Sequence, residues 1–283
     1  MKRFAYIYLI FILSNCSNYG QLTYVTKLPK AVKENSGLAY FKSNTVWLIE
    51  DHGNEDVLYQ VDFNGDLLNE LKVKNAKNED WEDIAQDSEG NIYIADFGNN
   101  NNDRKDLVIY KIPNPEIEPG DKIDAQQIKF YYPEQTKFPP EKKNLVYDAE
   151  AIFYKNKTLY IITKNRSEPF NGKALIYKVP SEKGTYAAEL VGEFTPCTTT
   201  RICEVTSAAI SPDGNKIALL GYGYLWIFTD FTTDDFTKGN LQTINLGATT
   251  QLESICFKDN STVLISDEER GNTGRNLYSY KLK

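Results

Sequence analysis

The sequence predicts an all-β fold, a five-bladed β-propeller of four-stranded blades, and three observations support this prediction. Short runs of β-branched and aromatic residues recur along the chain, bounded by Gly, Asn, Asp or Pro. The same unit of strands recurs five times, at intervals of 46, 68, 56 and 47 residues, as expected for propeller blades with insertions. Tight turns with Asn–Gly or Asp–Gly separate neighbouring strands, which hairpins require.

The strands can be placed in order from this repeat. The first strands align at Ser36, Glu82, Glu150, Thr206 and Glu253. Second strands follow at residues 46–49, 92–95, 159–162, 217–220 and 263–266, and third strands are centred on residues 58–59, 109–110, 176–177, 225–226 and 277–278. Fourth strands are predicted at residues 67–73, 127–132, 189–194 and 241–246. The last unit lacks a fourth strand, so residues 21–29 are expected to supply it and to close the ring, which removes a free sheet edge.

Length and repeat count give different blade numbers. The length between residues 21 and 283 corresponds to six blades of about 44 residues, whereas the repeated unit occurs five times. We expect five blades, with the excess in two insertions at residues 113–147 and 195–204. A degenerate sixth blade within residues 113–147 is the alternative.

Composition excludes several classes of protein. With 283 residues, 41% of them hydrophobic, the chain has an ordinary globular composition rather than that of a disordered or fibrous protein. Its formal net charge of −7 argues against nucleic acid as a partner. One histidine and four cysteines are too few for ordinary zinc or copper sites, so any metal is expected to be Ca²⁺ or Mg²⁺ held by oxygen ligands.

The N-terminal residues have the layout of an export signal. Lys2 and Arg3 precede an apolar run at residues 4–13, which is too short to span a bilayer. The run ends before Cys16 and resembles a bacterial lipoprotein signal, which implies lipidation of Cys16, with ordinary secretion as the alternative. We therefore expect a signal peptide at residues 1–15, a tether at 16–20 and one propeller domain at 21–283. The protein is expected to be a monomer, exported to the periplasm or the outer membrane, with the membrane as a partner through the lipid.

Export makes cysteine pairing plausible, because exported proteins meet an oxidising compartment. Cys197 and Cys203 bracket a five-residue run and are expected to form a disulfide, whereas Cys256 lies in an apolar strand and is expected to be a buried thiol. The alternative is that all three remain reduced.

Acidic residues recur at two equivalent places in the blades. One set comprises the aligned glutamates at the starts of first strands, and the other follows the second strands, at Asp51, Asp96, residues 164–166 and residues 267–270. In a propeller these two places lie on one face, around the central channel. Converging carboxylates offer the six to eight oxygen ligands that Ca²⁺ accepts. The predicted metal ligands are therefore Glu82, Asp96, Glu150, Glu253 and Asp267. The alternative is that each carboxylate accepts backbone N–H bonds or pairs with a neighbouring arginine.

Basic residues also recur in the loops after the second strands. Arg104 and Arg270 are candidate substrate-binding residues, because guanidinium groups bind phosphate or carboxylate. Lys164 and Arg166 are candidate catalytic residues beside the acidic set. The alternative is that these cations neutralise the acidic ring. His52, the only histidine, is a candidate general base.

Trp81 is a candidate for stacking a ligand at the channel mouth, although an aromatic residue beside a strand start more often packs in the core. No serine lies in a recognisable nucleophile motif, which argues against a Ser-His-Asp hydrolase.

Three segments carry a family resemblance: residues 36–39, 81–85 and 148–152. They resemble the blade starts of exported propellers of the phytase-like and gluconolactonase-like groups. Residues 164–168 and 174–177 are similar to a loop and strand of β-propeller phytases, where such an arginine binds phosphate. A five-bladed architecture with axial acidic residues is also similar to that of calcium-dependent nucleotidases. The fourth unit departs from this pattern, because it has Thr206 where others have glutamate and residues 221–223 in place of a polar loop.

Two functions are compatible with this pattern. The first is a Ca²⁺-dependent hydrolase that acts on a small anionic ester, such as a phosphate ester, or on a lactone at the channel mouth. The second is a non-catalytic binding or scaffold lipoprotein in which the metal is structural.

Overall fold

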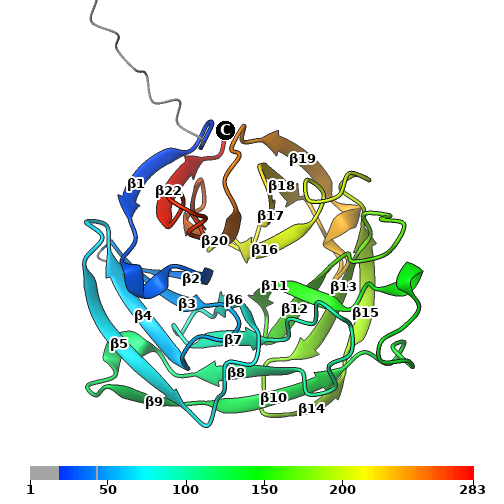
Figure 1. Cartoon of the computed structure of the whole chain (residues 1–283), viewed down its shortest axis with the longest axis horizontal. Helices are drawn as coiled ribbons and strands as arrows, with labels where there is room; N and C mark the ends of the chain where they lie inside the picture. The colour runs from blue at the N-terminus through cyan, green and yellow to red at the C-terminus, as the bar shows by residue number, and fades with distance from the viewer. Residues whose placement is uncertain (1–18, 43) are drawn as a thin grey trace, which may run out of the picture.

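The computed structural model describes residues 19–42 and 44–283 and is a five-bladed β-propeller (Figure 1). The prediction of five blades is confirmed. Cys16 and the predicted signal lie outside the described residues. Within these residues, no helix is long and apolar enough to cross a membrane.

Each blade is an antiparallel sheet whose first strand lies nearest the axis (Figure 1). Blade 1 contains β2 (Asn35–Phe41), β3 (Thr45–Glu50), β4 (Val57–Asp62) and β5 (Leu67–Lys74). Blade 2 contains β6 (Trp81–Gln86), β7 (Ile92–Asp96), β8 (Val108–Ile112) and β10 (Gln126–Tyr131), and blade 3 contains β11 (Asp148–Lys155), β12 (Thr158–Lys164), β13 (Ala174–Pro180) and β15 (Glu189–Phe194). Blade 4 contains β16 (Val205–Ile210), β17 (Ile217–Gly221), β18 (Tyr224–Thr229) and β19 (Asn240–Asn245). Blade 5 contains β20 (Leu252–Asp259), β21 (Thr262–Asp267), β22 (Asn276–Lys281) and β1 (Thr23–Lys27).

The ring closes through the N-terminal strand, as predicted. β1 pairs antiparallel with β22, with Thr23 opposite Ser279 and Lys27 opposite Asn276. This pairing joins the two ends of the propeller domain in one sheet. It also provides hydrogen-bond partners for the backbone groups of a sheet edge that would otherwise be open.

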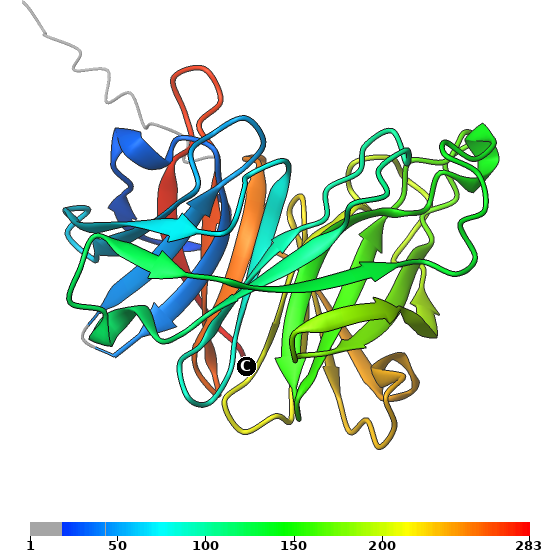
Figure 2. The same cartoon turned by 90° about the horizontal axis from the view of Figure 1, so that it is seen from below.

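The insertion after β8 does not form a sixth blade, so the six-blade alternative is wrong. Its first strand, β9 (Lys122–Asp124), adds in parallel to β5 of blade 1, and β10 then returns to pair with β8 of blade 2. Figure 2 shows this green segment running along the outside of the molecule between the two blades. A further short strand, β14 (Gly184–Ala187), pairs in parallel with β10, so blade 3 is tied to blade 2 in the same way.

The core lies between the blades. The central residues of the second strands are apolar because neighbouring blades cover both faces of each strand, and every residue of β3 and β7 is buried. Outer strands alternate instead, as in β5, where buried Leu71 and Val73 are flanked by exposed residues. The third strands place Tyr or Trp between blades, which explains the aromatic residue at each of those positions in the sequence.

One buried carboxylate joins the inner strands near the axis. Asp83 of β6 accepts hydrogen bonds from its own neighbour Ile84 N (2.8 Å), from Ile152 N of β11 (3.0 Å) and from Ala208 N (3.2 Å) and Ser207 Oγ (3.0 Å) of β16. Ser207 Oγ in turn accepts from Ile255 N of β20 at 3.1 Å. Four of the five blades therefore share one hydrogen-bonded network. Asp83 belongs to none of the sets of functional residues predicted from the sequence.

Candidate functional site

A β-bulge occurs at the same place in all five inner strands. The pairing of each first strand with its second strand skips one residue near the start, and the skipped residues are Ser36, Glu82, Glu150, Thr206 and Glu253. These are the five positions at which the sequence repeats align. A bulge locally redirects a side chain, so the repeat places one polar side chain per blade at one end of the axis.

The bulge residues without a carboxylate connect neighbouring blades. Ser36 Oγ donates to the carbonyl oxygen of Glu82 at 2.7 Å, and Thr206 Oγ donates to the carbonyl oxygen of Leu252 at 2.9 Å. Blades 1 and 4 thus contribute structural hydrogen bonds at this position, whereas blades 2, 3 and 5 contribute carboxylates.

The carboxylates at this end of the axis gather into two overlapping groups. Asp51, Asp80 and Glu82 form one, and Glu82, Asp148 and Glu150 form the other; within each group, ligand oxygens lie within 4.8 Å of one another. Two oxygens bound to the same Ca²⁺ at about 2.4 Å can be at most about 4.8 Å apart. Glu82 belongs to both groups, so we treat these five residues as one acidic cluster.

Glu82 is the central member of the acidic cluster and has no compensating partner. The residue is only 4% exposed, and within the described part of the chain no hydrogen bond or ion pair reaches its carboxylate. Burial, followed by the negative charges of Glu150, Asp51 and Asp80, raises the pKa of Glu82 well above its usual value. Either protonation or a bound cation would stabilise a carboxylate in these surroundings.

The backbone of Gly98 lies directly against this carboxylate. A Cβ atom at position 98 would be 2.2 Å from Glu82 Oε1 and 2.5 Å from Asp80 Oδ2. The loop after β7 therefore needs glycine here to let two carboxylates approach the same point.

Basic residues compensate one side of the acidic cluster. Lys164 Nζ lies 2.9 Å from Glu150 Oε2, and Arg166 bridges Glu150 Oε1 (3.0 Å) and Asp148 Oδ2 (2.6 Å). Burial and the nearby carboxylates raise the pKa of Glu150 to about 8, although Lys164 opposes this shift. Lys164 and Arg166 are thus held by the acidic cluster rather than free.

Glu253 connects to the acidic cluster through a relay of hydrogen bonds. Tyr222 Oη donates to Glu253 Oε1 at 2.8 Å, and Lys164 Nζ donates to Tyr222 Oη at 3.3 Å. Tyr222 lies in the segment that replaces the polar loop of blade 4, so its hydroxyl takes the place of a charged loop residue.

Two of the predicted metal ligands have other partners. Asp267 accepts hydrogen bonds from Thr250 Oγ1, Asn276 N and Tyr278 Oη, and is not part of the acidic cluster. The assignment of Asp267 as a metal ligand is therefore corrected, because its carboxylate accepts hydrogen bonds from residues of its own blade. Asp96 Oδ1 pairs with Arg104 Nη2 at 2.9 Å and accepts from Asp80 N at 3.1 Å, so Asp96 supports the loop that carries Asp80.

Trp81 and Arg104 are not placed to bind a substrate, which corrects both expectations. Trp81 is fully buried, donates its indole N–H to the carbonyl oxygen of Lys77 at 3.0 Å and packs against Tyr110. The guanidinium group of Arg104 forms ion pairs with Asp96 and Asp106 and donates a hydrogen bond to the carbonyl oxygen of Gly98.

His52 lies at the edge of the acidic cluster, with its side chain 73% exposed. Its Nδ1 is hydrogen-bonded to the carbonyl oxygen of Glu79 and is 3.8 Å from Asp80 Oδ1. A carbonyl oxygen can only accept, so Nδ1 carries the proton and Nε2 of the neutral ring is left to accept one. The hydrogen bond to Glu79 raises the pKa of His52 above its usual value.

A cavity of about 230 Å³ adjoins this region on the blade 4 side. Its lining includes Tyr222, Gln251, Arg201 and Arg270. Within the described residues, neither guanidinium group has an ion pair or a side-chain hydrogen bond. Arg201 lies in the loop closed by the Cys197–Cys203 disulfide, whose Cα atoms are 5.3 Å apart. Cys256 is a buried free thiol.

Several residues of the site were not predicted as ligands. Asp80 and Asp148 stand two residues before the aligned glutamates of blades 2 and 3, so a repeated Asp-x-Glu pattern was a usable signal. Asp51 was expected on this face but not as a ligand. Glu268, which accepts a hydrogen bond from Gln251 Nε2, was expected on this face within residues 267–270 but not as a ligand. Arg201 was not singled out as a functional residue.

Comparisons with known proteins show the fold. No protein-family model and no curated protein matches the sequence. The PQQ-bound aldose sugar dehydrogenase of Streptomyces coelicolor aligns with 93% of this chain and 98% of its own, at 11% identity and a TM-score of 0.52. A structural-genomics protein of unknown function from Bacteroides thetaiotaomicron aligns with 92% of this chain and 75% of its own, at 10% identity and a TM-score of 0.52. The gluconolactonase XC5397 of Xanthomonas campestris aligns over 88% and 72%, at 12% identity and a TM-score of 0.47.

Proposed function

We propose that the acidic cluster binds one Ca²⁺ and that the protein hydrolyses a small anionic ester or lactone beside it. The observation that carries the proposal is Glu82, a buried carboxylate without a partner at the point where four other carboxylates converge. Oxygen-only ligands favour Ca²⁺ over softer metals. When bound, the ion would polarise an ester oxygen and lower the pKa of water.

The chain supplies the remaining groups that hydrolysis needs. His52 presents Nε2 as a proton acceptor at the solvent side of Asp80. Arg201 and Arg270 in the adjoining cavity are without ion pairs in the described chain, and are therefore suited to hold the anionic group of the substrate. Lys164 and Arg166 form ion pairs with Glu150 and Asp148 and offset part of the negative charge of the acidic cluster.

A substrate panel tests the proposed activity. We expect p-nitrophenyl phosphate, bis-p-nitrophenyl phosphate or a sugar lactone to be hydrolysed in Ca²⁺, and turnover to be lost in chelator. Glu82→Gln should lower turnover at least tenfold, whereas the exposed Glu70→Gln should leave it unchanged. His52→Gln should lower kcat, while Arg201→Gln and Arg270→Gln should mainly raise KM. Turnover that is unaffected by Glu82→Gln would contradict the proposal.

A second candidate function is a non-catalytic binding or scaffold protein with a structural Ca²⁺. The two cations nearest the cluster favour it, because Lys164 and Arg166 are both held in ion pairs. In this case Ca²⁺ would raise the melting temperature, and no member of the panel would be hydrolysed.

We also propose that the protein is exported and anchored through a lipid on Cys16. The basic and apolar segments before Cys16 support this proposal, and so does the Cys197–Cys203 disulfide, which is typical of oxidising compartments. Cys16→Ser should move the protein from the membrane pellet to the soluble fraction. A protein found in the soluble fraction with Cys16 intact would contradict the anchor.

A further inference from the structure

The described chain begins beside the wall of the candidate substrate cavity. Gln21 N donates to the carbonyl oxygen of Leu246 at 2.7 Å. The backbone of Gly20 lies so close to Gly247 that a Cβ atom at position 20 would clash with it. The next residue after Gly247 is Ala248, which lines the cavity of about 230 Å³. The N-terminal segment therefore joins the propeller next to this cavity.

The proposed lipid attachment point is close to this junction along the chain. Cys16 is three residues before Tyr19, and an extended chain spans at most about 3.6 Å per residue, so the two Cα atoms are within about 11 Å of each other. Tyr19 is fixed on the propeller, because its ring packs against that of Tyr278 with centroids 5.4 Å apart. A lipid on Cys16 would therefore hold this part of the propeller near the bilayer.

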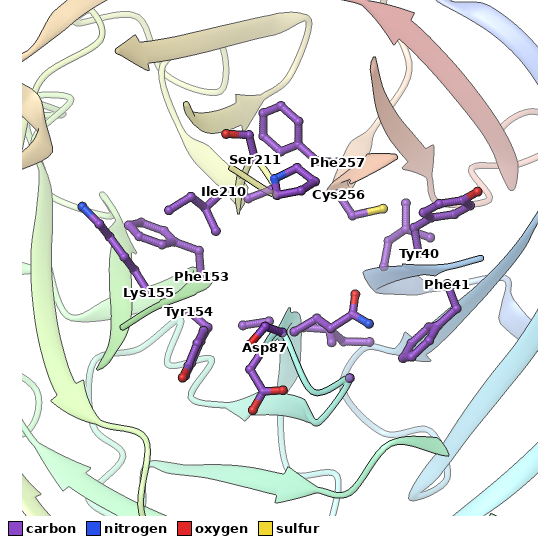
Figure 3. A pocket seen from close by; sticks show the side chains of 18 of the residues that line it. Tyr40, Phe41, Asp87, Phe153, Tyr154, Lys155, Ile210, Ser211, Cys256 and Phe257 are labelled. Atoms are coloured by element: carbon purple, nitrogen blue, oxygen red, sulfur yellow. The ribbon is translucent and has the colours of Figure 1, made fainter. Parts of the chain in front are cut away.

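The junction belongs to one end of the propeller axis. β20 starts directly after Gln251, which lines the candidate substrate cavity, and its eight residues span about 23 Å at about 3.3 Å per residue. The opposite end contains a larger cavity of about 830 Å³, and Figure 3 shows Phe153, Tyr154 and Lys155 in its lining. In Figure 2 the red loop between β21 and β22 projects at the first end, and the C-terminus lies at the other.

Two exposed apolar side chains lie near the junction. Tyr24 is 46% exposed, and its ring centroid is 6.4 Å from that of Tyr19. Ile202 is 40% exposed and follows Arg201, a lining residue of the candidate substrate cavity. Tyrosine suits a membrane interface because its ring is apolar and its hydroxyl is polar. An exposed isoleucine gains from leaving water for the same layer.

The charges near the junction are suited to lipid phosphates. Between residues 19 and 33 the chain contains three lysines and no acidic residue. Lys30 is exposed and forms no ion pair with any described residue. The carbonyl oxygen of Lys33 accepts from Glu269 N at 2.7 Å, and Glu269 precedes Arg270 of the cavity wall, so these lysines lie at the same end. Basic residues beside a lipid anchor strengthen attachment to membranes that contain anionic lipids.

We propose, on the basis of the proposed lipid anchor, that this end of the propeller lies against the bilayer. Tyr24 and Ile202 enter the headgroup layer, and Lys30 and Lys33 lie beside lipid phosphates. The candidate substrate cavity then lies next to the headgroups, and the larger cavity faces away from the membrane. The bilayer is the expected partner because the lipid attachment point, the exposed apolar side chains and the lysines are found at the same end.

Fluorophores at the two ends test this orientation. Asn272→Cys labels the loop between β21 and β22, and Ser88→Cys labels the turn between β6 and β7; both positions are exposed, whereas the native Cys256 is buried. The lipidated protein is bound to vesicles whose phospholipid headgroups carry a nitroxide quencher. We expect quenching at position 272 to be at least fourfold stronger than at position 88. Equal quenching in a protein that sediments with the vesicles would overturn the proposal, whereas failure to sediment would contradict the lipid anchor itself.

Two variants separate the contributions of the tether and the surface. A Gly/Ser insertion of about 20 residues before Tyr19, which adds about 25 Å of reach, should leave the protein on the vesicles and reduce the difference between the labels to less than half. Ile202→Asp should lower quenching at position 272 by about half. The matched control is Ile117→Asp, at a site 77% exposed in the segment after β8, which should change nothing. Unchanged quenching in Ile202→Asp would overturn the assigned surface. These measurements use neither turnover nor Ca²⁺, so they are independent of the proposed hydrolysis.

Discussion

Lys164 Nζ lies 2.9 Å from Glu150 Oε2, and the side chains of both residues are almost wholly buried, at 5% and 6% exposure. The pair is shared with the rest of the site, because Arg166 also contacts Glu150 and Tyr222 contacts Lys164. Although burial alone lowers the pKa of Lys164, the charges of Glu150, Tyr222 and Glu253 raise it well above its usual value. The lysine is therefore a permanent cation, and its charge offsets part of the rise in the pKa of Glu150.

Lys164→Met should destabilise the chelated protein by about 3 kcal/mol at neutral pH, because it leaves a buried carboxylate without its main counter-charge. Chemical denaturation followed by fluorescence measures this change. The double variant Lys164→Met with Glu150→Gln should regain part of the loss. Lys173→Met, which removes an exposed ion pair with Glu193, should cost less than about 1 kcal/mol. Equal losses for the two single variants would contradict this account.

Asp83→Asn should destabilise the propeller by at least about 2 kcal/mol, because one carboxylate serves four donors from three strands and an amide offers one accepting oxygen. Burial raises the pKa of Asp83 well above its usual value, yet its four donors all require an acceptor. Thermal and urea unfolding measure the effect. The control is Asp213→Asn, at an exposed turn where the carboxylate accepts hydrogen bonds from Ser211 Oγ and Asn215 N; a similar loss there would show that the axial position is unimportant.

Gly98→Ala should impair Ca²⁺ binding more than folding, because the added Cβ would displace the carboxylates of Glu82 and Asp80. We expect the rise in melting temperature caused by Ca²⁺ to shrink to less than half. Gly120→Ala is the matched control, since no atom other than its chain neighbours lies closer than 3.4 Å to the new Cβ. An undiminished response in Gly98→Ala would contradict the position assigned to the ion.

The chelated protein should lose stability as the pH rises from about 5 to about 9. Burial is the main cause that raises the pKa of Asp80 to about 7, of Glu150 to about 8 and of Glu268 to about 9. The folded protein then binds more protons than the unfolded chain in this window, so the free energy of unfolding falls with increasing pH. Melting temperatures measured with chelator should therefore decline across the window.

Ca²⁺ should reduce that decline, because a cation stabilises the ionised carboxylates. A melting temperature that rises with pH in chelator would contradict the shifts assigned to these three residues.

The sequence predicted the blade plan because the repeat is local. Each blade reproduces the same alternation of strands and turns, and the five aligned starts proved to be the five bulges. The outer strands β9 and β14 could not be predicted, since three or four residues that pair in parallel with another blade carry no pattern of their own.

The site was only partly predictable, because a recurring residue type does not reveal its partners. Glu82 and Glu150 lie in the acidic cluster. Asp267, which follows a second strand as Asp51 does, instead accepts hydrogen bonds from Thr250, Asn276 and Tyr278. Trp81 follows Asp80 and precedes Glu82, yet alternation along β6 places its ring in the core. The role of Asp83 could not be predicted from the repeat, because no other blade has a carboxylate at the equivalent position.

The most direct test of the account is calorimetric titration of the metal-free protein with Ca²⁺ at pH 7, beside Glu82→Gln and Glu70→Gln. The account predicts one bound ion in the wild type and in Glu70→Gln, and an affinity at least tenfold lower in Glu82→Gln. Absence of binding to the wild type, or equal affinity in Glu82→Gln, would contradict a cation site centred on Glu82.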